Sequence, residues 1–187
     1  EEDGDEWKGQ SVVCGVPYDE WKQSLIDHLI TPYIKPGDQV LEIAPGHGRW
    51  TQYLSDVAGH LTAVDLSPSC LAYCAKRFAD RTNIDYRQGD GSSLPEDLTG
   101  KLDVVWSFDS VVHIGPEDIA SYLRHIHRVL KPGGRLVAIV GQLPIMRAVL
   151  YTRSAGSSTD GAIGSVDLFD TVAPRLTGFE EPSRFHF

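Results

Sequence analysis

Three features are scarce in this 187-residue sequence: cysteines, basic residues and long apolar runs. The three cysteines, Cys14, Cys70 and Cys74, are an odd number without a disulfide framework, which is typical of the reducing cytoplasm. Lys and Arg number 17 against 26 Asp and Glu, which gives a formal net charge of −9. An acidic chain gains nothing from counterion release on DNA or RNA, so we expect no nucleic-acid partner.

No apolar run approaches the ~20 residues of a membrane-spanning helix, and no signal-peptide pattern opens the sequence, so we expect no membrane partner. The length suits one domain with a substantial core, which we assign to residues 18–187. Residues 1–17 are interpreted as an N-terminal arm, in which Trp7 either packs on the domain or covers a ligand as a lid. Because the sequence begins without Met and ends in a strand-like segment, the domain is also open to interpretation as truncated at its C-terminus.

What the sequence does contain is an alternation of strand-like and helix-like segments. The predicted strands are residues 40–43, 60–65, 83–87, 102–108 and 135–140, and the predicted helices are residues 18–34, 50–57, 67–79 and 116–130. Residues 131–134, KPGG, are expected to form the turn before the fifth strand. Beyond residue 141 we expect helices at 142–151 and 166–176, a loop at 152–164 and a last strand toward Phe187. The alternation implies an α/β fold: one mostly parallel, doubly wound sheet with helices on both faces.

Residues 40–50, VLEIAPGHGRW, read as a strand, a glycine turn and the start of a helix. Gly46 and Gly48 allow the backbone to approach a ligand closely, and the following helix offers unpaired N–H groups. Glu42, near the end of the strand, would repel a pyrophosphate. The turn is therefore better suited to a ligand that carries an ammonium or a sulfonium.

Two further acids follow the next two strands. Asp65, about twenty residues after the turn, can accept hydrogen bonds from both hydroxyls of a ribose; alternatively it caps the next helix, although Ser67 and Pro68 already provide that start. Asp90 can accept from an adenine amino group while Gly91 donates its N–H to the ring, or the pair is simply a turn. Carboxyl ends of parallel strands share one edge, so we expect these residues, with the segment 108–113, to form one site.

These segments together resemble the class I S-adenosylmethionine-dependent methyltransferases, which have a Rossmann-like fold. The family pattern of an acid and three alternating glycines corresponds here to residues 42–48, EIAPGHG, with Ala44 in place of the first glycine. Asp65 matches the acid after the second strand, Asp90 lies in the adenine-side segment, and residues 130–135, LKPGGR, match the turn before the fifth strand. The resemblance spans about residues 18–140. An NAD-binding fingerprint is a weaker match, because Thr51 stands where its third glycine would be.

The resemblance implies S-adenosylmethionine as cofactor, with the turn of Ala44, Gly46 and Gly48 under its amino-acid portion and Glu42 near the ammonium. It further implies that Leu66 packs on the adenine and that Phe108 lines the methionine side. The two antiparallel strands that close the family's sheet are expected to be incomplete.

Methyl transfer to a hydroxyl requires that the hydroxyl lose a proton, and His113, just past the fourth predicted strand, is a candidate base. Asp109 would orient His113 or bind the acceptor. Alternatively, His113 only packs at the start of the following helix. Seven histidines without ligand spacing, and the isolated pair Cys70 and Cys74, indicate no metal site.

The short segments around His113 and the glycine turn are similar to those of small-molecule O-methyltransferases, including enzymes that act on sugars or secondary metabolites. We therefore expect O-methylation of a small-molecule acceptor. Alternatives are N- or C-methylation on the same fold, and a catalytically inactive cofactor-binding or scaffolding module. The oligomeric state, a homo-oligomer included, stays open at this point.

Overall fold

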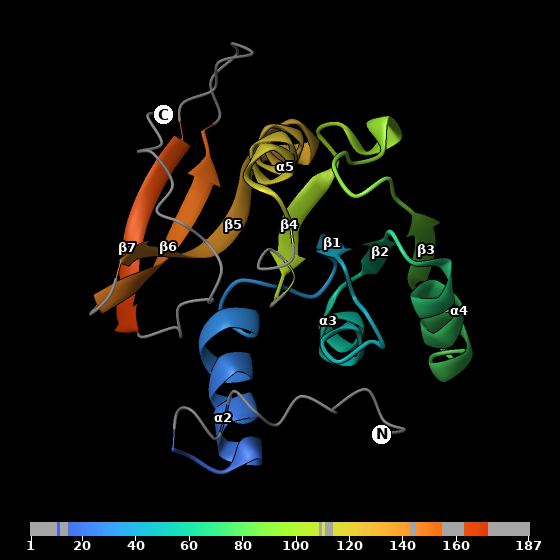
Figure 1. The fold of residues 1–187 in the computed structure, drawn as a ribbon, viewed down its shortest axis with the longest axis horizontal. Helices are drawn as coiled ribbons and strands as arrows, with labels where there is room; N and C mark the ends of the chain where they lie inside the picture. The colour runs from blue at the N-terminus through green and yellow to red at the C-terminus, as the bar shows by residue number, and fades with distance from the viewer. Residues whose placement is uncertain are drawn as a thin grey trace.

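A seven-stranded sheet forms the centre of the protein, with the strand order β3-β2-β1-β4-β5-β6-β7 (Figure 1). The computed structural model describes residue 11 and residues 15–108, 110, 114–142, 145–154 and 163–171. The strands are β1 (Gln39–Ile43), β2 (His60–Asp65), β3 (Ile84–Gln88), β4 (Leu102–Ser107), β5 (Leu130–Gln142), β6 (Ile145–Arg153) and β7 (Ile163–Thr171). β1 to β5 run parallel, whereas β6 and β7 add to the sheet in antiparallel fashion. The predicted mostly parallel, doubly wound sheet is confirmed.

Helices cover both faces of this sheet, as predicted (Figure 1). They are α2 (Tyr18–Leu25) with its π-helical continuation η1 (Ile26–Ile30), α3 (Thr51–Val57), α4 (Pro68–Arg77), the short 3-10 helix η2 (Glu96–Leu98) and α5 (Pro116–Val129). Side chains alternate across a strand, so Val40 joins the core under η1 and α3, while its neighbour Leu41 joins the core under α5. Two apolar layers thus fix the sheet from opposite sides.

Local sequence explains where several elements begin. The Ser67 hydroxyl accepts the Cys70 amide at 3.4 Å and caps α4, and Pro68 takes the first helical position, where a missing N–H costs nothing. The expected KPGG turn is present as an irregularity inside β5. Leu102 pairs with Leu130, but Val104 already pairs with Arg135, so the intervening residues bulge out of the ladder.

Two predicted helices are wrong, because residues 145–153 and 163–171 form β6 and β7. Both segments are short mixtures of apolar and polar residues whose periodicity does not separate helix from strand. Pairing decides the outcome: β6 is hydrogen-bonded to β5 on one side and to β7 on the other. The antiparallel closing strands that we expected to be incomplete are therefore present. The ends of the expected loop at residues 152–164 belong to β6 and β7. Residues 155–162 and the predicted last strand lie outside the described residues.

The helix predicted at residues 18–34 ends earlier, at Ile30, after its π-helical turn. Most of the N-terminal arm, including Trp7, lies outside the described residues. Within the described part of the chain, no helix has both the length and the apolar character needed to span a bilayer.

Gly48 gives a test of how tightly the glycine turn packs on the fold. Its φ is +86°, and a Cβ added there would lie 2.5 Å from the Phe78 ring and 3.2 Å from the Cys74 sulfur. At Gly46, with φ +56°, an added Cβ would meet nothing within 4 Å. We expect Gly48→Ala to lower the free energy of unfolding by about 2–4 kcal/mol and Gly46→Ala by only about 1 kcal/mol, because only the former adds overpacking to backbone strain. Urea denaturation of both variants measures this, and equal losses would contradict the packing seen here.

Candidate functional site

The carboxyl ends of four parallel strands meet at one edge of the sheet. Ile43 of β1 pairs with Val64 of β2 and with Ser107 of β4. Asp65 of β2 pairs with Gln88 of β3. The segments that follow these strands therefore lie side by side, and they include most of the predicted binding residues. Open α/β sheets bind ligands outside such strand ends, where the strand order changes direction, which here is between β1 and β4.

The turn after β1 has a left-handed backbone at three alternating positions. The φ angles are +56° at Ala44, +56° at Gly46 and +86° at Gly48. Among the described residues Ala44 is the sole non-glycine with positive φ, a conformation that costs an L-residue about 1–2 kcal/mol. The Ala44 amide donates to the Val64 carbonyl at 2.8 Å, which holds this conformation. Glycine is thus the residue that this position favours, and alanine occupies it under strain.

Glu42 is buried in surroundings that favour its protonated form. It is 2% exposed, and within the described part of the chain its side chain accepts one hydrogen bond, from the Thr51 hydroxyl at 2.6 Å. Burial raises the pKa of Glu42 to about 8, the Thr51 hydrogen bond lowers it and the nearby charge of Asp65 raises it. A cation brought to this site would stabilise the ionised form, whereas an anion would not. This agrees with the expected preference for a positively charged group.

Asp65 is held by two backbone amides. Its Oδ2 accepts from the Gly46 N–H at 3.1 Å and its Oδ1 accepts from the Ser67 N–H at 2.8 Å. Ser67, not Asp65, is the N-cap of α4, so the alternative reading of Asp65 as a cap does not hold. A carboxylate offers about four acceptor positions, so each oxygen keeps one for a ligand hydroxyl.

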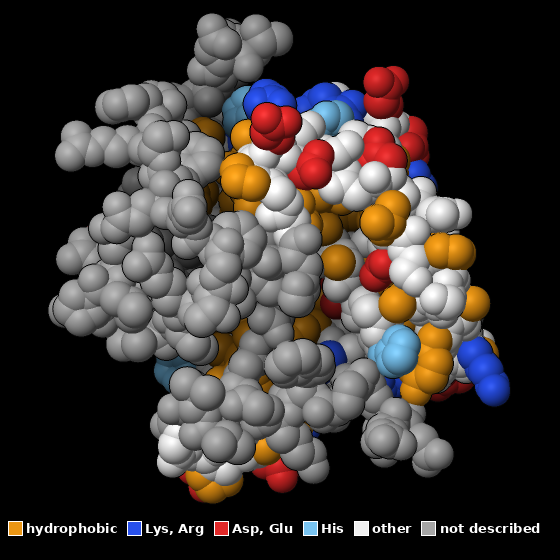
Figure 2. All heavy atoms as spheres, viewed as in Figure 1, with side chains coloured by type: hydrophobic (Ala, Val, Ile, Leu, Met, Phe, Trp, Pro, Cys, Tyr) orange, Lys and Arg blue, Asp and Glu red, His pale blue; other side chains and the backbone are white. Residues whose placement is uncertain are grey.

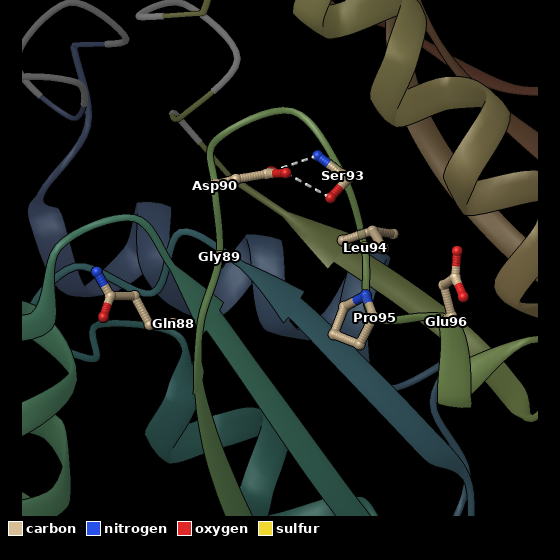
Figure 3. Close-up of a pocket in the computed structure, with 7 residues that line it drawn as sticks. All are labelled: Gln88, Gly89, Asp90, Ser93, Leu94, Pro95 and Glu96. Carbon is tan, nitrogen blue, oxygen red and sulfur yellow. Dashed lines mark hydrogen bonds between the residues drawn. The ribbon is translucent and has the colours of Figure 1, made fainter.

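Asp90 is used mainly inside its own turn (Figure 3). Its Oδ1 accepts from the amides of Ser92 at 2.9 Å and Ser93 at 2.7 Å, and its Oδ2 accepts from the Ser93 hydroxyl at 2.7 Å. These hydrogen bonds, led by that of the Ser93 side chain, lower the pKa of Asp90 to about 2. The structure therefore confirms that Asp90 stabilises a turn. Contact of Asp90 with an adenine stays a prediction.

An apolar surface lies next to this turn. Leu66 is 62% exposed, and its Cδ2 is 3.6 Å from the position of a Cβ added at Gly91, whose φ is +86°. A hollow of about 460 Å³ opens beside Asp90. It is lined by Gln88, Gly89, Asp90, Ser93, Leu94, Pro95 and Glu96. Acidic and apolar side chains reach the described surface between α5 and α4, where the strand ends lie (Figure 2). An exposed Leu beside a glycine offers a flat apolar contact for a planar ring.

Phe108, at the end of β4, belongs to an aromatic cluster under α2. Its ring centroid is 4.9 Å from that of Trp50 and 6.1 Å from that of Trp21. The indole nitrogens of Trp50 and Trp106 are buried without a hydrogen-bond partner among the described residues. The cluster links the glycine turn to β4. Whether Phe108 also lines a ligand stays a prediction.

Sequence reasoning missed three residues that shape the site: Thr51, Cys74 and Arg77. Thr51 bonds Glu42, as described above, and was noted only as the residue that breaks an NAD fingerprint. Cys74 is fully buried, as expected, but its thiol also donates to the Gly46 carbonyl at 3.2 Å. Arg77 donates to the His47 carbonyl at 2.9 Å. Helical spacing could have shown that Cys74 and Arg77 share one face of α4. It could not have shown that this face packs against the turn.

The predicted catalytic residues Asp109 and His113 lie outside the described residues. Within the described part of the chain, no group of three or more His, Cys, Asp or Glu side chains could hold a metal ion.

Glu42 makes the stability of the protein depend on pH in a definite direction. The folded protein holds the Glu42 proton with a pKa of about 8 against a usual 4.5, so stability falls as the pH rises between these values. Glu42→Gln keeps an oxygen for Thr51 but has no proton to lose. We expect the free energy of unfolding of the wild type, relative to the variant, to fall by about 1–4 kcal/mol between pH 5 and 8. Urea titrations at several pH values test this, and identical pH slopes for both proteins would contradict it.

Comparison with known proteins agrees with this geometry. A family profile described as a methyltransferase domain matches residues 40–134, just over half of the chain. A ubiquinone biosynthesis O-methyltransferase of Pseudomonas aeruginosa is 30% identical over 54% of this chain and 43% of its own length. A demethylmenaquinone methyltransferase of Staphylococcus epidermidis is 29% identical over 73% of this chain and 55% of its own length. The chain thus spans about half the length of these curated relatives.

A solved structure described as an S-adenosylmethionine-dependent methyltransferase from Mesorhizobium loti superposes with a TM-score of 0.52 at 25% identity. The match covers 63% of this chain and 51% of that one. The profile includes the glycine turn, Asp65 and the Asp90 turn, and the superposed fold is the same doubly wound sheet. The chain therefore belongs to the methyltransferase-domain family, with the fold of the class I S-adenosylmethionine-dependent methyltransferases.

Proposed function

We propose that this protein transfers a methyl group from S-adenosylmethionine to a hydroxyl of a small-molecule acceptor, at the edge formed by the carboxyl ends of β1 to β4. One observation carries the proposal: two acids adjoin the left-handed turn after β1, the buried Glu42 bonded to Thr51 and Asp65 bonded to the Gly46 amide. That arrangement suits a ligand with a positive charge at one end and a diol at the other. Family membership and methyltransferase relatives support it.

Each binding residue has a chemical task in this proposal. Glu42 ionises as the cofactor's ammonium approaches, and Asp65 accepts hydrogen bonds from the ribose hydroxyls. Leu66 and Gly91 supply an apolar face for the adenine, and Asp90 lies at its edge. The Ala44–Gly48 turn lies under the amino-acid portion, and Phe108 lines the methionine side.

When bound, S-adenosylmethionine supplies a sulfonium methyl group that an acceptor oxygen can displace in line. The protein's main task is to align the acceptor, and orientation alone can supply ~7 kcal/mol or more of the barrier reduction. His113 would take the proton that the acceptor hydroxyl loses, and Asp109 would orient that imidazole or bind the acceptor.

The acceptor class is the less constrained part of the proposal. One relative is named as an O-methyltransferase of ubiquinone biosynthesis, which favours transfer to oxygen, whereas the name of the other gives no position of transfer. A fold does not determine a substrate, so the proposed acceptor stays a hydroxyl of a sugar or a secondary metabolite. N- or C-methylation is the second candidate, and a cofactor-binding module without turnover is the third.

Two free cysteines, Cys70 and Cys74, support a cytoplasmic location.

Calorimetric titration with S-adenosylmethionine and S-adenosylhomocysteine tests the cofactor assignment. We expect micromolar binding that Asp65→Ala weakens at least about tenfold, because two hydrogen bonds to a charged acceptor are lost. Asp103→Ala is the matched control: Asp103 also accepts a backbone amide, that of Gln39 at 2.9 Å, but at the opposite edge of the sheet. No binding by a folded wild type, or equal losses in both variants, would contradict the proposal.

His113→Ala tests the catalytic step separately. We expect kcat for a hydroxyl acceptor to fall about 10²–10⁴-fold, because a general base is removed, while the affinity for S-adenosylhomocysteine stays within about twofold. His127→Ala, on α5, is the control variant. Methyl transfer followed with a labelled methyl group gives kcat, and an unchanged kcat in His113→Ala would favour N- or C-methylation or a different base.

A further inference from the structure

One face of α4 packs against the glycine turn of residues 44–48, and Cys74 on this face contacts Gly46. The Cys74 thiol is fully buried and donates to the Gly46 carbonyl at 3.2 Å. Burial raises the pKa of this thiol to about 12, so the proton needed for this hydrogen bond is retained. The sulfur also lies 3.2 Å from the position of a Cβ added at Gly48. Cys74 therefore contacts the turn by a hydrogen bond and by packing.

The next turn of α4 contacts the following residues. Arg77 Nη1 donates to the His47 carbonyl at 2.9 Å, and the Phe78 ring fills the space where Gly48 would carry a side chain. The His47 ring stacks on Tyr73 of α4 with centroids 4.4 Å apart. Three successive residues of the turn, 46 to 48, are thus each met by side chains of α4.

These contacts determine how the peptide groups of the turn are oriented. The C=O and N–H of a trans peptide point in opposite directions. Because the Gly46 carbonyl is bonded to Cys74, the His47 N–H is directed away from α4. The Gly46 N–H is bonded to Asp65 Oδ2 at 3.1 Å, so the turn is held from two sides. Glycines alone would leave it free to adopt other conformations.

We propose that Cys74 and Arg77 are positioning residues that hold the glycine turn in its binding conformation, so that α4 sets the cofactor affinity through the turn. The expected change in cofactor affinity rests on the proposed function, whereas the expected change in the turn's conformation does not. It assigns a task to two residues that the proposed reaction does not use directly.

The chain offers a matched control four residues further on, at Arg81, just past the end of α4. The guanidinium groups of Arg77 and Arg81 lie over the same Phe78 ring, at 5.1 and 5.6 Å from its centroid. Arg81, however, donates to the Ser55 hydroxyl at 2.6 Å and to Asp56 at 2.7 Å, and so connects the segment after α4 to α3. Within the described part of the chain, the Arg81 guanidinium donates to Gln52, Ser55 and Asp56 and not to residues 46–48.

The test compares Arg77→Met with Arg81→Met. In the free protein, we expect amide hydrogen exchange at Gly48 and its neighbours in the turn to become about tenfold faster in Arg77→Met, because a charge-assisted hydrogen bond to the turn is lost. Arg81→Met should change it less than about twofold, and Arg77→Lys, which keeps a donor, should restore part of the protection. The dissociation constant for S-adenosylhomocysteine should rise about tenfold in Arg77→Met alone.

A second pair of variants covers the case in which Arg77→Met does not fold. Cys74→Ser keeps a donor for the Gly46 carbonyl and Cys74→Ala removes it, so faster exchange in the turn is expected for Ala only. Equal effects of the two arginine variants, or no change in the turn in any variant, would overturn the inference. If the wild type binds no S-adenosylhomocysteine, the proposed function fails, and the exchange data still decide whether α4 holds the turn.

Discussion

The hydrogen bond from the Gly46 amide to the Asp65 carboxylate joins the turn after β1 to the end of β2, and much of the site depends on it. The end of β2 holds neighbouring segments in two further places. The Val64 carbonyl accepts the Ala44 amide at 2.8 Å, and the Asp65 carbonyl accepts the Gly89 amide at 2.9 Å. The segments that follow β1 and β3 are therefore both fixed to β2. A ligand that contacts Asp65 will contact a surface whose shape is already determined by the backbone.

The parallel part of the sheet could be predicted from the sequence. Strands β1, β2 and β4 contain short apolar runs followed by turn residues or acids, and His60–Asp65 was predicted without error in its bounds. Their parallel arrangement follows from the helices between them. β6 and β7 were out of reach because their identity depends on pairing with β5 and with each other, which no local pattern encodes. The bulge at residues 131–134 has the same origin, since sequence shows a turn but not the ladder that continues around it.

The sequence predicted which residues lie at the candidate site better than it predicted their hydrogen-bond partners and protonation. Asp65 lies at the expected edge, but its two amide partners come from sequence-distant and local segments that only folding brings together. Glu42 was interpreted as a carboxylate, and the burial that raises its pKa is a property of packing. Asp90 was given a choice between turn and ligand, and its bonds to Ser93 account for the turn. The contacts of α4 with the glycine turn had no signal in the sequence, because neither Cys74 nor Arg77 is part of a motif.

The cofactor site that we propose includes the buried Glu42, whose pKa burial raises to about 8. If the cofactor's ammonium lies beside Glu42, as proposed, binding favours the ionised carboxylate and releases its proton. Titration with S-adenosylhomocysteine at pH 7, in two buffers that differ in ionisation enthalpy, measures that proton directly. The account predicts micromolar binding with release of about one proton in the wild type and none in Glu42→Gln. Binding without proton release in the wild type, or no binding by the folded protein, would contradict it.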